Sequence, residues 1–109
     1  MNSELERFVA ACVARGESEE EGNSKKATKQ YKIIDSIFLK LKETNRLEEL
    51  QTLYDHEDLY VRLYAASRTL GLPNSGAEEV LTMLSSHRGL LGFNAEMTLS
   101  EWRKGNLKR

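Results

Sequence analysis

Apolar residues recur three and four positions apart along most of this chain, which is the spacing of one face of an α-helix. Leu5, Phe8 and Cys12 show this spacing near the N-terminus, and similar stripes follow in the later segments. No run alternates apolar and polar residues as a half-buried strand does, and the chain has a single proline. The sequence therefore predicts an all-α fold.

Glycine, asparagine and proline residues divide the helical pattern into about six segments. We expect helices over 3–21, 24–43, 46–54, 58–70, 74–84 and 90–104, with the fifth beginning at Asn74 or Ser75. Gly16 is not expected to end the first helix, because the glutamates after it favour helix and Gly22 is the better stop. Asp58 is the predicted N-cap of the fourth helix. With 109 residues and one cysteine, the chain makes a single domain, 1–109, without a disulfide.

The last four predicted helices contain a weak repeat with an offset near 30 residues. Val61 corresponds to Leu91, and Ala65 corresponds to Ala95. A helix pair that repeats at this length indicates a solenoid, in which each pair buries its apolar face against the next pair. We therefore expect antiparallel helix pairs in a HEAT-like α-α superhelix.

The segment 58–70 matches the second helix of a HEAT-like repeat in several positions. Two consecutive alanines, Ala65 and Ala66, let neighbouring helices approach closely, while Val61 and Leu70 fill the layer. Arg62 is placed to bond either the carbonyls of the preceding turn or Asp58.

A longer set of motifs resembles one family over nearly the full length. The motifs are Phe8-Val9-Ala10-Ala11, Gly22-Asn23 before a lysine-rich helix, Leu39-x-Leu41, the 58–70 segment, Ala77-x-x-Val80-Leu81, and Ala95-x-Met97-x-Leu99-x-x-Trp102-x-x-Gly105-x-Leu107. Together they resemble a small bacterial domain-of-unknown-function family, number two-thousand-nineteen. The resemblance implies a HEAT-like all-α superhelix and brings no catalytic residue, cofactor or activity. One departure is Thr28-Lys29, where the family leads us to expect an asparagine or an arginine pair.

Catalytic and metal-binding patterns are weak in this sequence. Cys12 lies on an apolar stripe, which is typical of a small buried residue rather than of a nucleophile. His56 and His87 lie in corresponding turns, but helices stacked about 8 to 10 Å apart cannot bring both to one zinc. No glycine-rich phosphate loop is present. We expect no enzyme activity, no cofactor and no metal.

Lysines on the second predicted helix are the best candidates for binding nucleic acid. Lys25, Lys29 and Lys32 share a face and could follow a phosphate backbone. The other interpretation is a solvated face that pairs with the acidic residues 17–21. Four successive blocks, 1–23, 24–46, 47–60 and 61–109, have net charges of −4, +5, −5 and +3. This alternation is typical of helices that neutralise each other, and it argues against nucleic acid.

The fourth predicted helix carries the leading candidate for a protein-binding surface. Tyr60, Tyr64 and Arg68 follow at steps of four residues, and tyrosine and arginine are enriched in interface hot spots. The hypothesis is that they form an open third face on an internal solenoid helix. The alternative is that both tyrosines pack under the second helix and only their hydroxyl groups reach water.

Phe93 and Met97 point away from the predicted core stripe of the last helix. They indicate a homodimer or partner contact if exposed, whereas burial in the core is the other interpretation.

The sequence thus predicts a module that binds another protein as a regulator or inhibitor, for example in immunity against a bacterial toxin. A nucleic-acid-binding helical domain is the alternative. No stretch reaches the roughly 20 apolar residues of a membrane span, so we expect a cytoplasmic protein.

Overall fold

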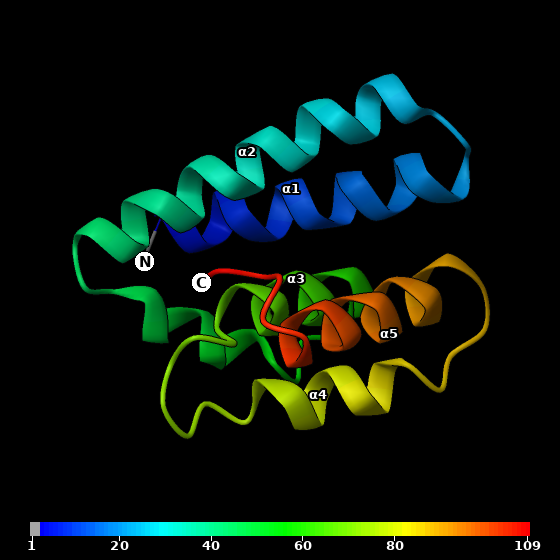
Figure 1. The fold of residues 1–109 in the computed structure, drawn as a ribbon. Coiled ribbons are helices and arrows are strands. Elements are labelled where there is room, and N and C mark those ends of the chain that lie inside the picture. Colours follow the sequence, from blue (N-terminus) through cyan, green and yellow to red (C-terminus); the bar gives the residue numbers. More distant parts are fainter. Residues whose placement is uncertain (1–2) are drawn as a thin grey trace.

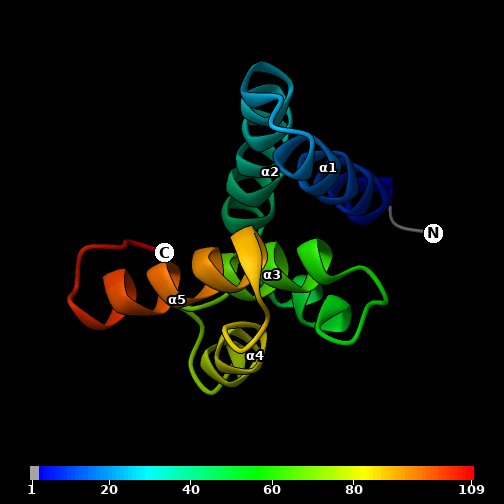
Figure 2. The same cartoon turned by 90° about the vertical axis from the view of Figure 1, so that its right-hand side faces the viewer.

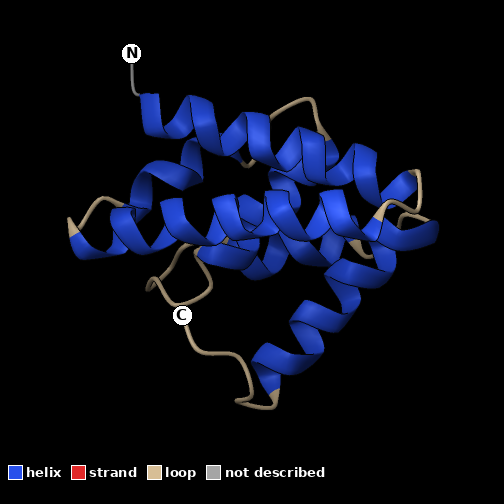
Figure 3. Ribbon diagram, turned by 90° about the horizontal axis from the view of Figure 1, so that it is seen from above, coloured by secondary structure: helices blue, strands red, loops and turns tan. Residues whose placement is uncertain are grey.

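A computed structural model describes residues 3–109 of the chain. This part contains five α-helices, one 3-10 helix and no strand (Figures 1 and 3). The elements are α1 (Ser3–Glu20), α2 (Ser24–Glu43), η1 (Leu47–Leu53), α3 (Leu59–Arg68), α4 (Ala77–Leu84) and α5 (Gly89–Arg103). The all-α prediction is confirmed.

Most predicted helices lie where the apolar spacing put them, with small differences at the ends. The second helix has the predicted bounds, and the first continues through Gly16. The third element is a 3-10 helix rather than an α-helix. Helix α3 ends at Arg68, two residues before Leu70, and α4 begins only at Ala77. The late start of α4 has a local cause, because the Ser75 hydroxyl oxygen accepts the Ala77 N–H at 3.2 Å.

Asp58 fixes the start of α3 as the sequence predicts. Its carboxylate accepts the backbone N–H groups of Tyr60 and Val61 at 2.9 and 3.1 Å, which satisfies two donors of the first turn. The Arg62 Nε donates to the backbone carbonyl of His56 in the preceding turn. Of the two roles expected for this arginine, bonding to the turn is therefore confirmed.

The helices form two antiparallel pairs with α3 between them. Helices α1 and α2 run in opposite directions, and so do α4 and α5 (Figure 1). Figure 2 shows the α1–α2 pair on one side of α3 and α4 on the other. Helix α3 packs against α1, η1, α4 and α5. It is consequently the most enclosed element, and seven of its ten residues are buried.

The hydrophobic core draws large side chains from both pairs and from the elements between them. Its most enclosed apolar side chains are Phe8, Ile34, Leu41, Leu50, Leu63 and Leu81. Ala65 and Ala66 of α3 are fully buried, as expected where helices cross closely. Overpacking at such positions is costly, because interiors are already close-packed.

Gly16 allows α1 to approach α3 closely. A Cβ atom at this position would lie 2.5 Å from Cδ2 and 2.6 Å from Cγ of the Tyr60 ring. A glycine inside a helix costs about 1 kcal/mol relative to alanine, and here the close packing of the tyrosine offsets that cost. The glycine therefore positions two helices instead of ending one.

Candidate functional site

The predicted protein-binding face of α3 is largely closed. Tyr64 is 4% exposed and Arg68 is 2% exposed, while Tyr60 is partly buried. The hypothesis of an open face centred on these residues is therefore wrong. The physical reason is that α3 has neighbours on every side, so the α1–α2 pair covers the face that a solenoid helix was expected to leave open.

The alternative interpretation, in which both tyrosines pack under the second helix, is confirmed for Tyr64 but not for Tyr60, which is only partly buried and packs on Gly16 of α1. The Tyr64 ring meets the Tyr31 ring of α2 edge-on, with 6.4 Å between ring centroids. The Tyr60 hydroxyl donates to the Glu20 carboxylate at 2.8 Å, and the Tyr64 hydroxyl donates to Glu19 at 3.4 Å. Both rings thus seal the contact between α1 and α3. Burial, together with the glutamates of α1, raises the pKa of both phenols above their usual range.

Around Arg68 lies a group of side chains that we call the arginine–aromatic cluster: Arg15, Tyr31, Phe38, Arg68 and Arg109. The guanidinium carbons of Arg15 and Arg68 lie 5.0 and 5.1 Å from the Tyr31 ring centroid. Those of Arg68 and Arg109 lie 5.6 and 5.8 Å from the Phe38 ring centroid. Cations at these distances are attracted by the ring electrons, and more strongly when they are removed from water.

The Arg68 guanidinium is incompletely satisfied. Its Nη1 donates to the Ser67 hydroxyl at 3.4 Å, but within residues 3–109 Nε and Nη2 have no hydrogen-bond partner. The nearest carboxylate oxygen, Oδ1 of Asp35, lies 3.9 Å from Nη2. That distance allows charge attraction but exceeds a hydrogen bond. A buried charged group with open donors is costly, so this edge of the molecule requires an explanation.

Arg109 brings a second cation to the same place. Its Nε donates to the Ser67 backbone carbonyl at 2.7 Å, and its Nη2 donates to the Ser67 hydroxyl at 3.0 Å. Burial, with the neighbouring charge of Arg68, lowers the pKa of Arg109 to about 10. The two guanidinium groups therefore repel each other across a partly dry space.

The exposed large apolar side chains concentrate on α5 and its neighbour. Leu90, Phe93 and Met97 are 49%, 61% and 43% exposed. They recur at steps of three and four residues, so they share one face of the helix, which we call the α5 apolar stripe. Met83 of α4 is also exposed. Burial of Phe93 and Met97, one of the two expected outcomes, is thus wrong, because the core stripe of α5 runs through Leu91, Ala95 and Leu99.

The start of the α5 apolar stripe borders a pocket beneath the α1–α2 turn. Leu90 forms one wall of this pocket of about 250 Å³, and residues of the turn and of both helices form the rest. Arg15 lines it and pairs with Glu19 at 3.3 Å. The stripe therefore continues toward a polar recess.

All three lysines proposed for nucleic acid, Lys25, Lys29 and Lys32, are exposed on α2. Within the described range they form no ion pair with the acidic residues 17–21, so the expected neutralisation across the α1–α2 turn is not observed. In that acidic segment Glu19 instead pairs with Arg15, and Glu20 accepts from Tyr60.

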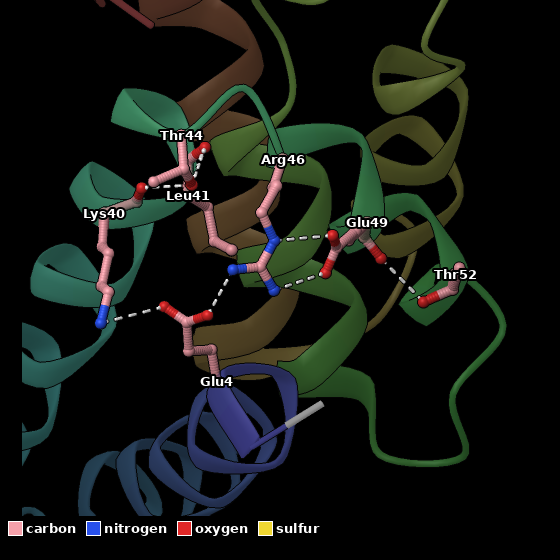
Figure 4. Close-up of polar contacts among 7 residues, drawn as sticks. All are labelled: Glu4, Lys40, Leu41, Thr44, Arg46, Glu49 and Thr52. Atoms are coloured by element: carbon pink, nitrogen blue, oxygen red, sulfur yellow. Dashed lines mark hydrogen bonds and ion pairs between the residues drawn. The ribbon is translucent and has the colours of Figure 1, made fainter. Parts of the chain in front are cut away.

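A second arginine network ties three elements together at the opposite end of the α1–α2 pair. Arg46 contacts both Glu49 carboxylate oxygens, at 2.9 and 3.2 Å, and its Nη1 lies 2.6 Å from Glu4 (Figure 4). Lys40 lies 3.5 Å from the same glutamate. The hydrogen bond from Arg46 lowers the pKa of Glu4, and the two glutamates raise the pKa of Arg46. Because its charges satisfy one another, this network serves to hold α1, α2 and η1 together.

The histidines and the cysteine of the described residues do not form a metal site. No group of three or more side chains with ligating atoms could hold a metal ion among residues 3–109. His56 accepts the backbone N–H of Asp58 at 3.0 Å and so supports its own turn. Cys12 is fully buried, and burial raises the pKa of its thiol, which disfavours the reactive thiolate. Nor is any described helix both long and apolar enough to cross a membrane.

Comparison with known proteins adds no relative. No family model, no curated protein and no solved structure matches this chain.

The sequence pointed to some of these features and missed others. Phe93 and Met97 are exposed as one interpretation had it, but Leu90 was not recognised as part of their stripe. The sequence pattern predicts Arg68 on an open face of α3, whereas the structure buries it. The available signal was its position seven residues after Val61, which put it on a buried face of the same helix.

Proposed function

We propose that this chain is a module that binds another protein, and that it makes contact through the α5 apolar stripe. The observation that carries the proposal is the exposure of Leu90, Phe93 and Met97 on one helical face. Apolar anchors at this spacing suit helix-in-groove recognition, and methionine adapts its shape to a partner. The surface differs from the one that the sequence favoured, whereas the class of function is the same. Inhibition of a bacterial toxin is one concrete form of this function.

A photo-crosslinking amino acid placed at position 93 tests the proposal in the native cells. We expect it to capture one defined protein, which mass spectrometry identifies. The matched control carries the same amino acid at Glu6, which is exposed on α1. Equal products from both positions, or none from position 93, would contradict the proposal.

A second copy of the chain is one such partner, through Phe93 and Met97. Sedimentation equilibrium distinguishes this case. A dimer that Phe93→Asp dissociates supports a homodimer, while a monomer at high concentration directs the search to other proteins. The control, Glu96→Asp, should not change the result.

Nucleic acid is the second candidate partner, and one observation favours it. Lys25, Lys29 and Lys32 are exposed and unpaired within the described residues, so their charges are free to meet phosphates. Fluorescence anisotropy with a labelled oligonucleotide should then show binding that weakens steeply with salt and that Lys29→Glu abolishes. The exposed Lys108→Glu is the control. No binding at low salt removes this candidate.

We further propose that the helix pairs are HEAT-like repeats and that the chain belongs to the family it resembles. The supporting features are the antiparallel pairs, the Asp58 cap and the buried Ala65 and Ala66. The substitution Ala66→Leu, described below, tests this register.

A further inference from the structure

The unsatisfied edge of Arg68 has the shape of a binding group. Nε–H and the adjacent Nη2–H point in parallel, and this edge of a guanidinium grips two oxygen atoms of a carboxylate or phosphate at once. Both nitrogens lack an acceptor within residues 3–109, although the side chain is 2% exposed. Such a donor pair in a protein interior calls for an oxyanion.

The charges around this edge also favour an anion. Arg15 is neutralised by Glu19 at 3.3 Å. Arg68 and Arg109 are the other two arginines of the cluster. The Lys42 ammonium adds a further positive charge, 5.8 Å from the Phe38 ring centroid. Among the described residues, the Asp35 carboxylate pairs with Arg68 at 3.9 Å, and its charge also acts on Arg109. The arginine–aromatic cluster thus has a surplus of positive charge.

Asp35 also shows where a ligand enters. Its side chain is 48% exposed, and it stands 3.9 Å from Arg68 Nη2 without closing to a hydrogen bond. The neighbouring Tyr31 is 39% exposed. The Nε and Nη2 atoms of Arg68 are themselves closed to solvent, so an anion that binds them must enter from the solvent side of α2 and displace the Asp35 carboxylate, which competes with it.

We infer that Arg68 and Arg109 bind a small oxyanion, either a carboxylate or a phosphate group, between α2 and α3 beside Asp35. Arg68 supplies the paired donors from the interior. Arg109 supplies a second positive charge from the rim, and the two aromatic rings hold both guanidinium groups in position. This site does not rest on the protein-binding surface proposed above.

The Nε–Hε signals of the arginines in a ¹H–¹⁵N NMR spectrum report on the site directly. Inorganic phosphate and acetate are titrated separately, at constant ionic strength maintained with sodium chloride. We expect the Arg68 signal to shift and saturate with at least one of the two anions. The anion that binds more tightly identifies the ligand as phosphate or carboxylate.

Three variants should change the affinity for the anion in different directions. Asp35→Asn removes the competing carboxylate and should tighten binding by roughly tenfold. Arg109→Gln should weaken binding by roughly tenfold, because one charge-assisted partner is lost. Lys108→Gln makes the same change of charge at an exposed neighbour and should have no effect.

The inference does not depend on a variant of the buried Arg68, which could fail to fold. It is overturned if chloride alone reproduces the shifts, if both glutamine variants respond equally, or if Asp35→Asn weakens binding. The last result would show that Asp35 does not compete with an anion for Arg68.

Discussion

Helices α3 and α5 use their residues in opposite ways. Helix α3 carries two tyrosines and two arginines, types that are enriched in interfaces, and it encloses Tyr64 and Arg68 in the interior. Helix α5 carries leucine, phenylalanine and methionine, and it exposes three of them. The difference shows that the number of helices packed around a helix decides whether its residues are buried or exposed. The residue types along one face do not decide this.

Shortening one side chain on each helix tests this comparison. We expect the larger loss of stability for the variant on α3. We expect Tyr64→Ala to lower the free energy of unfolding by about 3 to 4 kcal/mol, because it leaves a cavity among packed rings. Phe93→Ala should change it by less than about 0.5 kcal/mol, as is usual for exposed positions. Thermal or urea unfolding measures both. Tyr64→Phe, which keeps the ring and loses the hydroxyl contacts with Glu19 and Arg15, should cost less than about 1 kcal/mol. Similar losses at positions 64 and 93 would refute the inside–outside contrast.

Overpacking tests the same contrast from the opposite direction. Ala66 is fully buried on α3, so Ala66→Leu should cost about 1 to 3 kcal/mol through displaced neighbours. Ala10 is exposed on α1, and Ala10→Leu is the control, for which little change is expected. A melting temperature of Ala66→Leu within a degree of wild type would refute the close helix crossing and the solenoid register.

Acid unfolding tests the Arg46 network. Unlike Arg68, Arg46 is satisfied by its carboxylate partners. The Arg46 hydrogen bond lowers the pKa of Glu4 in the folded protein below its ordinary value of 4.5. Ionised Glu4 therefore stabilises the fold above that pH, and this contribution is lost as the pH falls through the lowered pKa. We expect Glu4→Gln to reduce the loss of stability between pH 5 and the acid range, measured by urea unfolding.

Glu6 provides the control for Glu4. It is exposed on the same helix and forms no ion pair within the described residues. Glu6→Gln should leave the pH dependence unchanged. Equal behaviour of the two variants would show that the Arg46 network does not contribute in acid.

Metal removal should have the smallest effect of all. His56 already bonds its own turn, so we expect a chelator to leave the melting temperature unchanged. A loss of stability that zinc reverses would prove this wrong.

Local sequence patterns were sufficient for the elements but not for their environment. The Asp58 cap, the Arg62 turn contact and the course of α2 depend on residues close in sequence, and all were predictable. The burial of Arg68 depends on Tyr31 and Phe38, which lie some thirty residues away. Helical periodicity identifies the faces of a helix, but only packing decides which of them is covered.

The type of the third element shows the same limit. The apolar spacing of residues 47–53 suits an α-helix, and a 3-10 helix forms instead. In the same way, no periodicity shows that Gly16 lies under the Tyr60 ring. Such contacts become visible only when two distant segments are placed together.

The position of Arg109 has a consequence for how the protein unfolds. An open solenoid joins only consecutive pairs, so it can fray from either end. Here Arg109 reaches back to Ser67 of α3 and to the Phe38 ring of α2, which links the last residues to the first pair. Loss of either end therefore uncovers the middle helix. Amide hydrogen exchange in α2, α3 and α5 should accordingly report one shared opening event, as in a single cooperative unit.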